Sequence, residues 1–274
     1  MSAQIDPDAF NAFEAAGWEE RATGYHRAFG PLTSRVIGPL LDAAEVGPGR
    51  RMLDVCTGPG YVAAAGAARG ATVVGLDVAH EMVALARSLH HDVTFVQGDG
   101  ERLRFADHSF DAVVGNFAIL HFGRPERAAA EFARVLAPGG TVALTTWDVP
   151  GVARLPGIFF DAVQEAGATP PPDIPAGPPF FRFADEAEFG RLMKDAGLTE
   201  VAVTTVGFNH HFTGDLYDCL LEGTVRSRAL VASQPEATQA RVRAVLDRLS
   251  REYIAADGGL DIPVSVKLAS ARRA

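Results

Sequence analysis

The sequence predicts an α/β protein built around a mainly parallel sheet. Between residues 51 and 146, short apolar segments alternate with segments of helical periodicity, which is the pattern of repeated strand and helix units. Three of the apolar segments end in an acidic residue, namely Asp54, Asp77 and Asp99. Because parallel strands bring their carboxyl ends to one edge of a sheet, we expect these carboxylates to face a nucleoside-like ligand there.

The composition is that of a globular protein. The chain has 274 residues, of which 47% are hydrophobic and 22% charged, enough for one large domain with additions. No apolar run approaches the roughly 20 residues of a membrane-spanning helix, so we expect no membrane span. The net charge of -9, with no long cluster of Lys and Arg, argues against nucleic acid as a partner. The acidic N-terminus lacks the features of a secretory signal, which favours a cytoplasmic protein.

The two cysteines carry little information about metal binding. Cys56 and Cys219 lie far apart and match no metal-ligand spacing. We therefore expect neither a metal site nor a disulfide framework. Cys56 is interpreted as a small residue that fills a tight turn.

The central part of the chain is expected to contain five strands. In order, they cover residues 51–55, 71–76, 93–97, 110–114 and 141–146. The helices between them begin at Tyr61, cover 80–89 and cover 124–136. The segment APGG, at 137–140, is expected to end the last of these helices before the fifth strand begins.

The N-terminal segment, 1–44, is expected to be mostly helical from Pro7 onwards. It carries Trp18, Tyr25, His26 and Phe29 at spacings that are usual for core packing. The alternative is a helix folded over the ligand cleft, and both interpretations stay open at this point.

The C-terminal part, 151–274, differs from the core at 45–150. Its first stretch, about 151–182, contains TPPPDIPAGPP; because this is too rich in proline for a regular helix or a central strand, we expect a loop or lid. A helix, a strand, a helical block and a last strand follow at 183–198, 200–208, 216–253 and 262–268. We expect the segment of about 209–258 to form a helical cap.

The turn after the first strand is rich in glycine. Gly58 and Gly60 allow the backbone to approach a ligand closely, and the helix that follows directs free N–H groups at a negative group. With Ala63 they also satisfy the dinucleotide pattern GxGxxA, so an NAD-dependent oxidoreductase is one alternative. Asp54 argues against it, because its carboxylate would accept a hydrogen bond from a cationic amine but would repel a pyrophosphate.

The other two carboxylates suit an adenosine. Asp77 lies 23 positions after Asp54, where a carboxylate at the end of the second strand can accept from both ribose hydroxyls. Asp99, with Gly100 behind it, ends the third strand and could accept from the exocyclic amine of adenine. Together the three carboxylates favour an adenosine-like ligand that also carries an ammonium group.

Four segments occur in the order that is found in one enzyme family. They are LDVCTGPG at 53–60, VVGLDVAHEMVALAR at 73–87, VQGDGERLRFADHSFDAVVGNFAILHF at 96–122 and RVLAPGGTVALTTW at 134–147. On these segments the chain resembles a class I S-adenosylmethionine-dependent methyltransferase, of the small-molecule branch that includes the ubiquinone and menaquinone biosynthesis C-methyltransferases. The resemblance covers roughly residues 45–150 well and the rest loosely.

This resemblance implies a fold. The family has a Rossmann-like sheet of seven strands, mostly parallel with the last strand antiparallel, and helices on both faces. The strands expected at 200–208 and 262–268 would be the last two. The N-terminal helices, covering the cofactor cleft, and a helical cap insertion would be additions to this core.

The resemblance also implies S-adenosyl-L-methionine as cofactor and S-adenosyl-L-homocysteine as product. Its binding residues would be Tyr25, Asp54, Cys56, Thr57, Gly58, Gly60, Asp77, Val78, Met82, Asp99, Gly100, Glu101 and Asn116. Within this set, Asp77 would hold the ribose, Val78 and Met82 would flank the adenine, and the hydroxyl of Tyr25 would meet the methionine carboxylate. Cys56 stands where the family has the first glycine of its loop, and we expect a slightly tighter loop with retained binding.

A general base, where the acceptor needs one, is expected to be a histidine. The candidates are His121, His210 and His211, while His26 is less well placed. His121 follows the fourth strand at the edge where the methyl group would emerge, or it is a structural histidine. His210 and His211 either face the acceptor from the cap or lie in a surface loop. No metal is expected.

The predicted function is transfer of a methyl group to carbon, nitrogen or oxygen of a small, apolar or aromatic metabolite. Phe180, Phe181, Phe183, Phe208 and Phe212 flank the expected lid and suggest such an acceptor pocket, or plain packing. The alternatives are the NAD-dependent oxidoreductase and a protein that binds the cofactor for non-methylating chemistry. A monomer and a homodimer are both open.

Overall fold

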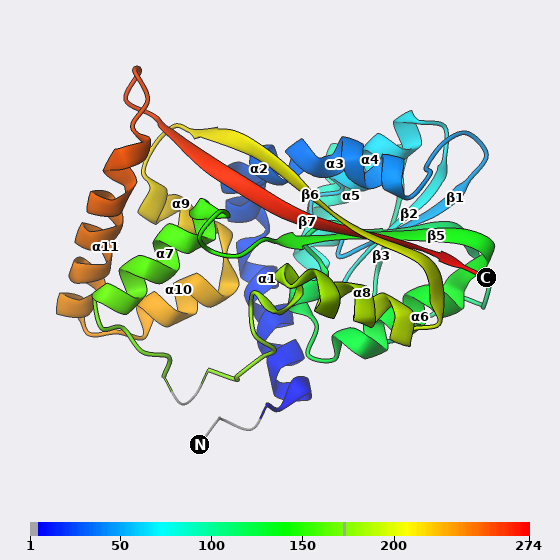
Figure 1. Cartoon of the computed structure of the whole chain (residues 1–274), viewed down its shortest axis with the longest axis horizontal. Helices are drawn as coiled ribbons and strands as arrows, with labels where there is room; N and C mark the ends of the chain where they lie inside the picture. Colours follow the sequence, from blue (N-terminus) through cyan, green and yellow to red (C-terminus); the bar gives the residue numbers. More distant parts are fainter. Residues whose placement is uncertain (1–4, 172–173) are drawn as a thin grey trace.

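A seven-stranded sheet forms the centre of the molecule in a computed structural model that describes residues 5–171 and 174–274 (Figure 1). Its strands are β1 (Arg51–Val55), β2 (Thr72–Asp77), β3 (Thr94–Gln97), β4 (Phe110–Gly115), β5 (Leu136–Trp147), β6 (Leu198–Phe212) and β7 (Leu260–Arg273). Their order is β3-β2-β1-β4-β5-β7-β6, and β7 runs antiparallel to both of its neighbours. This confirms the mostly parallel, Rossmann-like sheet with an antiparallel last strand.

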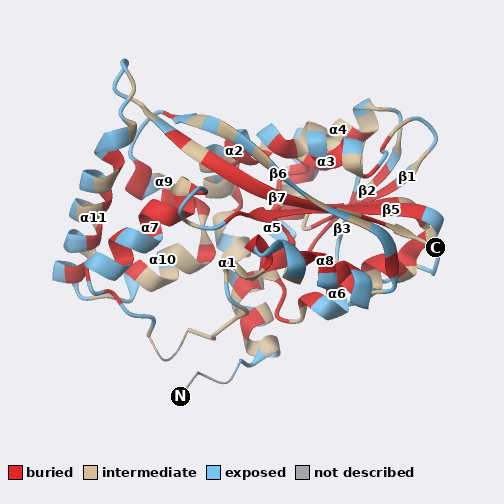
Figure 2. Cartoon of the chain, in the orientation of Figure 1, coloured by how far each residue is buried: buried red, intermediate tan, exposed pale blue. Residues whose placement is uncertain are grey.

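Helices cover both faces of the sheet because the side chains of each strand alternate between two apolar layers. One layer packs against α3 (Ile37–Ala43), α4 (Tyr61–Ala68) and α5 (His80–Leu89), and the other against α6 (Pro125–Val135) and α8 (Glu186–Asp195). In β1, for example, Met52 belongs to the first layer and Leu53 to the second. Figure 2 shows the buried sheet between these helices, with the edge strand β6 more exposed.

The strands β6 and β7 are longer than the expected 200–208 and 262–268. They pair with each other from Leu198 opposite Arg273 to Phe212 opposite Leu260. β7 pairs with β5 only over Val266–Arg272, so the two strands continue past the sheet as a twisted ribbon toward the cap (Figure 1). His210 and His211 therefore lie within β6, and not in a loop after it.

The segment APGG at 137–140 lies inside β5, which corrects the expectation that it precedes the strand. The helix α6 ends at Val135 and β5 begins directly at Leu136. Leu136 pairs with Phe110 and Thr141 pairs with Ala112, so the residues between them form a bulge. Gly139 has a φ of +73°, a conformation that glycine adopts without strain, and the strand can therefore continue through the bulge.

A helix occupies part of the stretch where we expected only a loop or lid. α7 covers Arg154–Glu165, and its apolar side chains, including Ile158 and Phe159, are buried. Pro156 is compatible with this helix because it lies in the first turn, where the backbone N–H has no helical partner. The proline-rich part from Thr169 onwards lacks regular structure where it is described, while residues 172 and 173 lie outside the described range.

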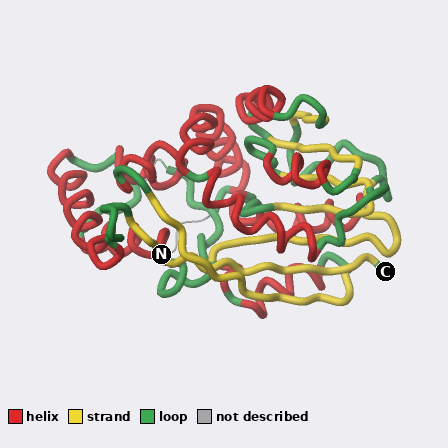
Figure 3. Tube along the Cα trace, turned by 90° about the horizontal axis from the view of Figure 1, so that it is seen from above, coloured by secondary structure: helices red, strands yellow, loops and turns green. Residues whose placement is uncertain are grey.

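The helical cap lies at one end of the sheet (Figure 3). It consists of α7, α9 (Leu216–Gly223), α10 (Val225–Ala232) and α11 (Glu236–Ser250), with short 3-10 turns at Ile119–His121, Arg182–Ala184 and Arg251–Tyr253 nearby. Its core also takes in Phe212, Ile262 and Val264 from the ribbon of β6 and β7. The strands β6 and β7 thus run continuously from the sheet into the core of the cap.

The N-terminal helix α1 (Pro7–Ala28) lies between the sheet and the cap (Figure 1). It is followed by α2 (Gly30–Thr33) and a 3-10 turn, Ser34–Val36, that leads into α3. Gly17 and Gly24 of α1 permit close packing against the cap. A Cβ at these positions would lie 2.2 Å from Val225 and from the carbonyl of Glu222, respectively. No helix among the described residues is both long enough and apolar enough to cross a bilayer.

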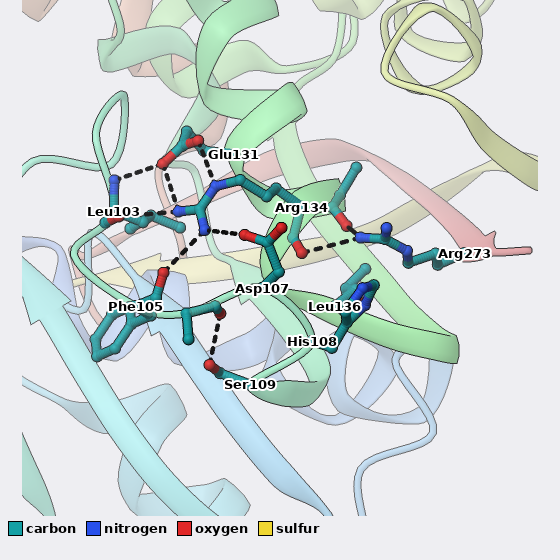
Figure 4. Close-up of polar contacts among 11 residues, drawn as sticks. Leu103, Phe105, Asp107, His108, Ser109, Glu131, Arg134, Leu136 and Arg273 are labelled. Atoms are coloured by element: carbon teal, nitrogen blue, oxygen red, sulfur yellow. Dashed lines mark hydrogen bonds and ion pairs between the residues drawn. The ribbon is translucent and has the colours of Figure 1, made fainter.

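Arg134 at the end of α6 holds the loop that follows β3 (Figure 4). It donates to the carboxylates of Glu131 and Asp107 at 2.7 Å each, and to the carbonyls of Phe105 and Leu103 at 2.8 and 2.9 Å. Glu131 in turn accepts from the backbone N–H of Leu103 at 2.8 Å. One guanidinium therefore satisfies two backbone carbonyls of a loop that has no sheet partner.

We expect Arg134→Met to lower the free energy of unfolding by about 2 kcal/mol, because the substitution leaves partly buried carbonyls and carboxylates without their donor. Urea unfolding would measure this loss. The control is Arg191→Met, which removes one exposed ion pair with Glu188 on α8 and should cost below about 0.5 kcal/mol. Equal losses in the two variants would contradict the structural role of Arg134.

Candidate functional site

A cavity of about 400 Å³ opens at the carboxyl ends of β1, β2 and β4. Its walls come from the turn after β1, from the residues that follow β2, β3 and β4, from α1 and from α10. Glu14, Trp18 and Tyr25 of α1 line it, so this helix does lie over the cleft while its aromatic rings pack against one another. His26 is not among the lining residues, and its Nδ1 makes a short hydrogen bond with the hydroxyl of Tyr61.

The glycine-rich turn forms one wall of this cavity. Cys56, Gly58 and Gly60 have φ values of +54°, +51° and +85°, so Cys56 adopts a conformation that favours glycine. A Cβ on Gly60 would come within 2.7 Å of the Phe95 ring, which explains glycine there. Burial and the surrounding carboxylates raise the pKa of the Cys56 thiol, so it stays a small neutral side chain.

Asp54 is buried beneath this turn with one carboxylate oxygen unsatisfied. Oδ2 accepts from the hydroxyl of Thr57 at 2.6 Å and from the backbone N–H of Ala63 at 3.1 Å. Oδ1 has no partner although it is buried. Burial raises the pKa of this carboxyl to about 7, as expected for a charge that is removed from water. An ammonium group in the cavity would satisfy Oδ1 and stabilise the ionised form.

Asp77 connects the end of β2 to the same turn. Its Oδ2 accepts from the backbone N–H of Gly58 at 2.8 Å and its Oδ1 from that of Ala79 at 3.0 Å. Each oxygen keeps a further lone pair for the hydroxyl groups of a ligand. Val78 and Met82 line the cavity as well. The site therefore offers an acidic group that suits a ribose and an apolar surface that suits an adenine.

The residues after β3 divide into two groups. Asp99 and Gly100 line the cavity, and Asp99 accepts from the backbone N–H of Glu101 at 2.8 Å. Glu101, which we expected among the cofactor-binding residues, is not among the residues that line the cavity. Its buried carboxylate accepts from Asn11 of α1 and from the backbone N–H of Arg124, each at 2.8 Å. Glu101 thus holds α1 to the core.

Asn116 and Tyr25 also line the cavity. Asn116 donates to the carbonyl of Thr33 at 3.0 Å and accepts from the hydroxyl of Thr145 at 2.7 Å. The hydroxyl of Tyr25 lies 3.3 Å from that of Thr33, and burial raises the pKa of Tyr25 to about 12. Tyr25 therefore remains a neutral hydrogen-bonding group.

Glu14 and Arg226 form a buried network with His121 that the sequence did not suggest. One carboxylate oxygen of Glu14 meets Nδ1 of His121 at 2.7 Å, and the other accepts from Nε of Arg226 at 2.7 Å. Trp18 also donates to Glu14 at 3.1 Å. Burial alone would raise the pKa of Glu14, but the charges of Arg226 and His121 hold it at about 2. Because an ionised carboxylate only accepts, Nδ1 of His121 carries the proton and a neutral imidazole has its lone pair on Nε2.

His210 and His211 lie apart from this network. Neither is among the residues that line the cavity. His211 makes exposed ion pairs with Asp261 at 2.7 Å and Asp257 at 3.1 Å, and the hydrogen bond to Asp261 raises its pKa. The ring of His210 packs edge-on against that of Phe212. Of the three histidine candidates, the geometry places only His121 at the cavity.

A second cavity, of about 720 Å³, adjoins the first and shares part of its wall. The shared residues are Phe29, Trp147, Phe180, Arg226 and Ser227. We call this second cavity the apolar chamber, because its remaining wall consists almost entirely of aromatic, aliphatic and proline side chains. They include Phe10, Phe13, Phe159 and Phe160.

The phenylalanines that we expected around an acceptor pocket are only partly those observed. Phe180 lines both cavities, whereas Phe181, Phe183, Phe208 and Phe212 line neither. Phe183 and Phe212 are buried in the apolar cores of the sheet and the cap. No group of three or more metal-ligating side chains is found in the described part of the chain.

Comparison with known proteins agrees with this geometry. A family model described as a methyltransferase domain matches residues 53–144. A demethylmenaquinone methyltransferase of Renibacterium salmoninarum is 37% identical over 127 residues, which cover 46% of this chain and 54% of that protein. The ubiquinone/menaquinone biosynthesis C-methyltransferase UbiE of Nitrobacter hamburgensis is 31% identical over 66% of this chain and 76% of that protein. The chain thus spans about half the length of the first relative and three quarters of the second.

A solved structure shares the fold. It is the Haemonchus contortus phosphoethanolamine N-methyltransferase 2 in complex with phosphomonomethylethanolamine and S-adenosylhomocysteine. The TM-score is 0.58 at 22% identity, and the match covers 96% of this chain and 60% of that one. The fold is therefore the one that this methyltransferase uses.

The raised pKa of Asp54 predicts a pH-dependent cost in stability. Between about pH 4 and pH 7 the folded protein keeps a proton on Asp54 that the unfolded chain has lost, so the contribution of Asp54 to stability falls as pH rises through this range. We expect Asp54→Asn, with no ligand added, to raise the free energy of unfolding by about 1–3 kcal/mol at pH 8, with little gain near pH 4. Urea unfolding at the two pH values measures it, and a gain that does not depend on pH would contradict titration of the buried carboxyl as its cause.

Proposed function

Because this chain belongs to the S-adenosylmethionine-dependent methyltransferase family, we propose that it transfers the methyl group of that cofactor to a small, apolar or aromatic metabolite. The cofactor would occupy the cavity at the carboxyl ends of the strands, and the acceptor would occupy the apolar chamber. The observation that carries this proposal is the unsatisfied, buried Oδ1 of Asp54, a residue that lines the cavity together with Thr57. A carboxylate is costly to bury without a partner, unless a ligand supplies one.

The residues of the first cavity suit each part of the cofactor. Asp54 would bind the ammonium of the methionine part, with Tyr25 and Asn116 near its carboxylate. Asp77 would accept from the ribose hydroxyls and Asp99 from the adenine amine. Gly58 and Gly60 would allow the backbone to approach, and Val78 and Met82 would enclose the adenine. When bound, the cofactor supplies an electrophilic methyl carbon on a positively charged sulfur.

The chain itself contributes positioning and the exclusion of water. The chamber wall has few polar side chains, namely Asp6, Arg226 and Ser227, so an apolar acceptor would displace weakly bound water on entering it. Phe29, Trp147 and Phe180 belong to both cavities, and they would hold the acceptor against the methyl group.

His121 would remove a proton from an acceptor that carries one on the reacting group. Its Nδ1–H is fixed by Glu14 at 2.7 Å, which leaves Nε2 as the basic atom. The buried Glu14 would stabilise the imidazolium that forms, as the carboxylate partner of a histidine base does in other enzymes. His210 and His211, which line neither cavity, have no such place in the proposal.

The oxidoreductase alternative finds no support in the family matches. A cytoplasmic location and a monomeric or homodimeric state are further parts of the proposal.

Calorimetric titration with S-adenosylmethionine, S-adenosylhomocysteine and NADH would test the cofactor. The proposal requires binding of the first two and none of the third. A screen of apolar aromatic acceptors, with S-adenosylhomocysteine formation as readout, would then test the transfer. Cofactor binding without product across a broad screen would instead favour non-methylating chemistry.

Asp77→Asn should weaken cofactor binding by about 1–3 kcal/mol, because charge-assisted hydrogen bonds to the ribose are lost while the shape of the side chain is kept. Calorimetric titration with S-adenosylhomocysteine measures this effect. Asp92→Asn, at an exposed position outside the cavity, is the matched control and should bind normally. Unchanged affinity of the Asp77 variant would remove this residue from the site.

His121→Asn should reduce kcat by about 10²–10⁴-fold for an acceptor that must lose a proton, because Asn can still donate to Glu14 but has no basic nitrogen. Affinity for S-adenosylhomocysteine should stay near that of the natural protein, and His91→Asn, which alters an exposed histidine, should be fully active. Retained turnover together with a loss of stability would identify His121 as structural.

A further inference from the structure

Arg226 lies where the two cavities meet. Its side chain lines both of them, and no other lysine or arginine among the described residues lines either one. The first cavity is otherwise acidic, with Glu14, Asp54, Asp77 and Asp99 in its wall. Among residues 5–171 and 174–274, Arg226 is therefore the one lysine or arginine at the junction of the two cavities.

The guanidinium of Arg226 is held in one orientation. Nε donates to Glu14 at 2.7 Å and Nη2 donates to the carbonyl of Leu120. The rings of Phe10 and Phe180 lie against the guanidinium, with centroids 4.9 and 5.3 Å from its central carbon. These contacts fix a flexible side chain before any ligand binds, which lowers the entropy lost on recognition.

One part of the guanidinium is left without a partner. Within residues 5–171 and 174–274, no hydrogen bond is found for Nη1, although the other two nitrogens are engaged. Arginine carries two N–H donors on that atom. Because Arg226 lines the apolar chamber, an unpartnered donor on it would favour ligands with an acceptor atom and disfavour ligands without one.

We propose that Arg226 selects the acceptor, by donating a hydrogen bond from Nη1 to an oxygen that the acceptor carries close to the methylated atom. The acceptor then combines an apolar body, in the chamber, with a carbonyl or an anionic oxygen at the junction. Glu14 is the positioning residue of this arrangement, because it holds Arg226 and His121 by its two carboxylate oxygens. This inference rests on the proposed function, since it assigns the chamber to the acceptor.

Three naphthalenes of similar size would test the proposal. They are 2-ethylnaphthalene, which has no oxygen, 2-acetonaphthone, which has a neutral carbonyl, and 2-naphthoate, which has an anionic carboxylate. Each is titrated into the protein saturated with S-adenosylhomocysteine, with tryptophan fluorescence as readout, since Trp147 lines both cavities. We expect both oxygen-bearing probes to bind at least about tenfold more tightly than 2-ethylnaphthalene, as a charge-assisted hydrogen bond predicts.

The variant Arg226→Met should bind the three probes with equal affinity, each titrated at a concentration of S-adenosylhomocysteine that saturates this variant. Arg228→Met, on the exposed side of the same helix, is the control and should keep the preference. Since Arg226→Met leaves Glu14 with fewer partners, the double variant Glu14→Gln/Arg226→Met removes both charges and serves if the single variant does not fold.

The outcomes separate this inference from the proposed function. Equal affinities in the natural protein, no binding of any probe, or a preference that survives in Arg226→Met would overturn the role of Arg226. Failure of the natural protein to bind S-adenosylhomocysteine would overturn the proposed function instead. The same three probes, titrated without it, would still report whether Arg226 recognises an oxygen.

Discussion

A buried carboxylate, that of Glu14, determines how the three parts of this molecule meet. Glu14 belongs to α1, while its partners His121 and Arg226 belong to the turn after β4 and to the cap helix α10. Each ion pair alone would only offset part of the cost of burying its charges. Shared through one carboxylate, the two pairs fix α1 over the sheet edge and against the cap at once. Residues of α1 line both cavities, so the position of this helix shapes both of them.

The sequence predicted the sheet and the acidic edge well, because their signals are local. The run Met52 to Gly60 shows strand, acidic residue and glycine turn within nine positions, and Asp77 and Asp99 follow strands with the same pattern. The apolar periodicity of each segment reflects its own burial. The structure therefore confirmed the mostly parallel sheet, and it places the three acidic residues in the wall of one cavity.

The remaining features depend on contacts that are distant in sequence. Glu14 and Arg226 are separated by 212 positions, and each reads as an ordinary surface charge on a helix until the fold brings them together. Pro156 led us to expect a loop in place of α7. A proline is compatible with a helix in its first turn, and that position is recognised only once the start of the helix is known. The extra length of β6 and β7 follows from their mutual pairing, which no single segment reveals.

The candidate site contains features that lower the stability of the folded protein. Asp54 buries an unsatisfied oxygen, and Cys56 holds a backbone conformation that glycine would adopt more easily. Such features are expected where a protein is shaped for a ligand and not for the empty state. By contrast, the loop held by Arg134 satisfies its carbonyls within the protein itself.

The ribbon of β6 and β7 has a mechanical consequence. β7 runs without interruption from the core of the cap, at Ile262 and Val264, into the sheet, where it pairs with β5 and β6. It therefore connects the cap to the sheet rigidly. A cap joined by flexible linkers could swing open as a rigid body, but this one would have to bend a paired antiparallel ribbon to do so. Ligand exchange should therefore not depend on rigid-body opening of the cap, which is a stationary part of the walls of both cavities.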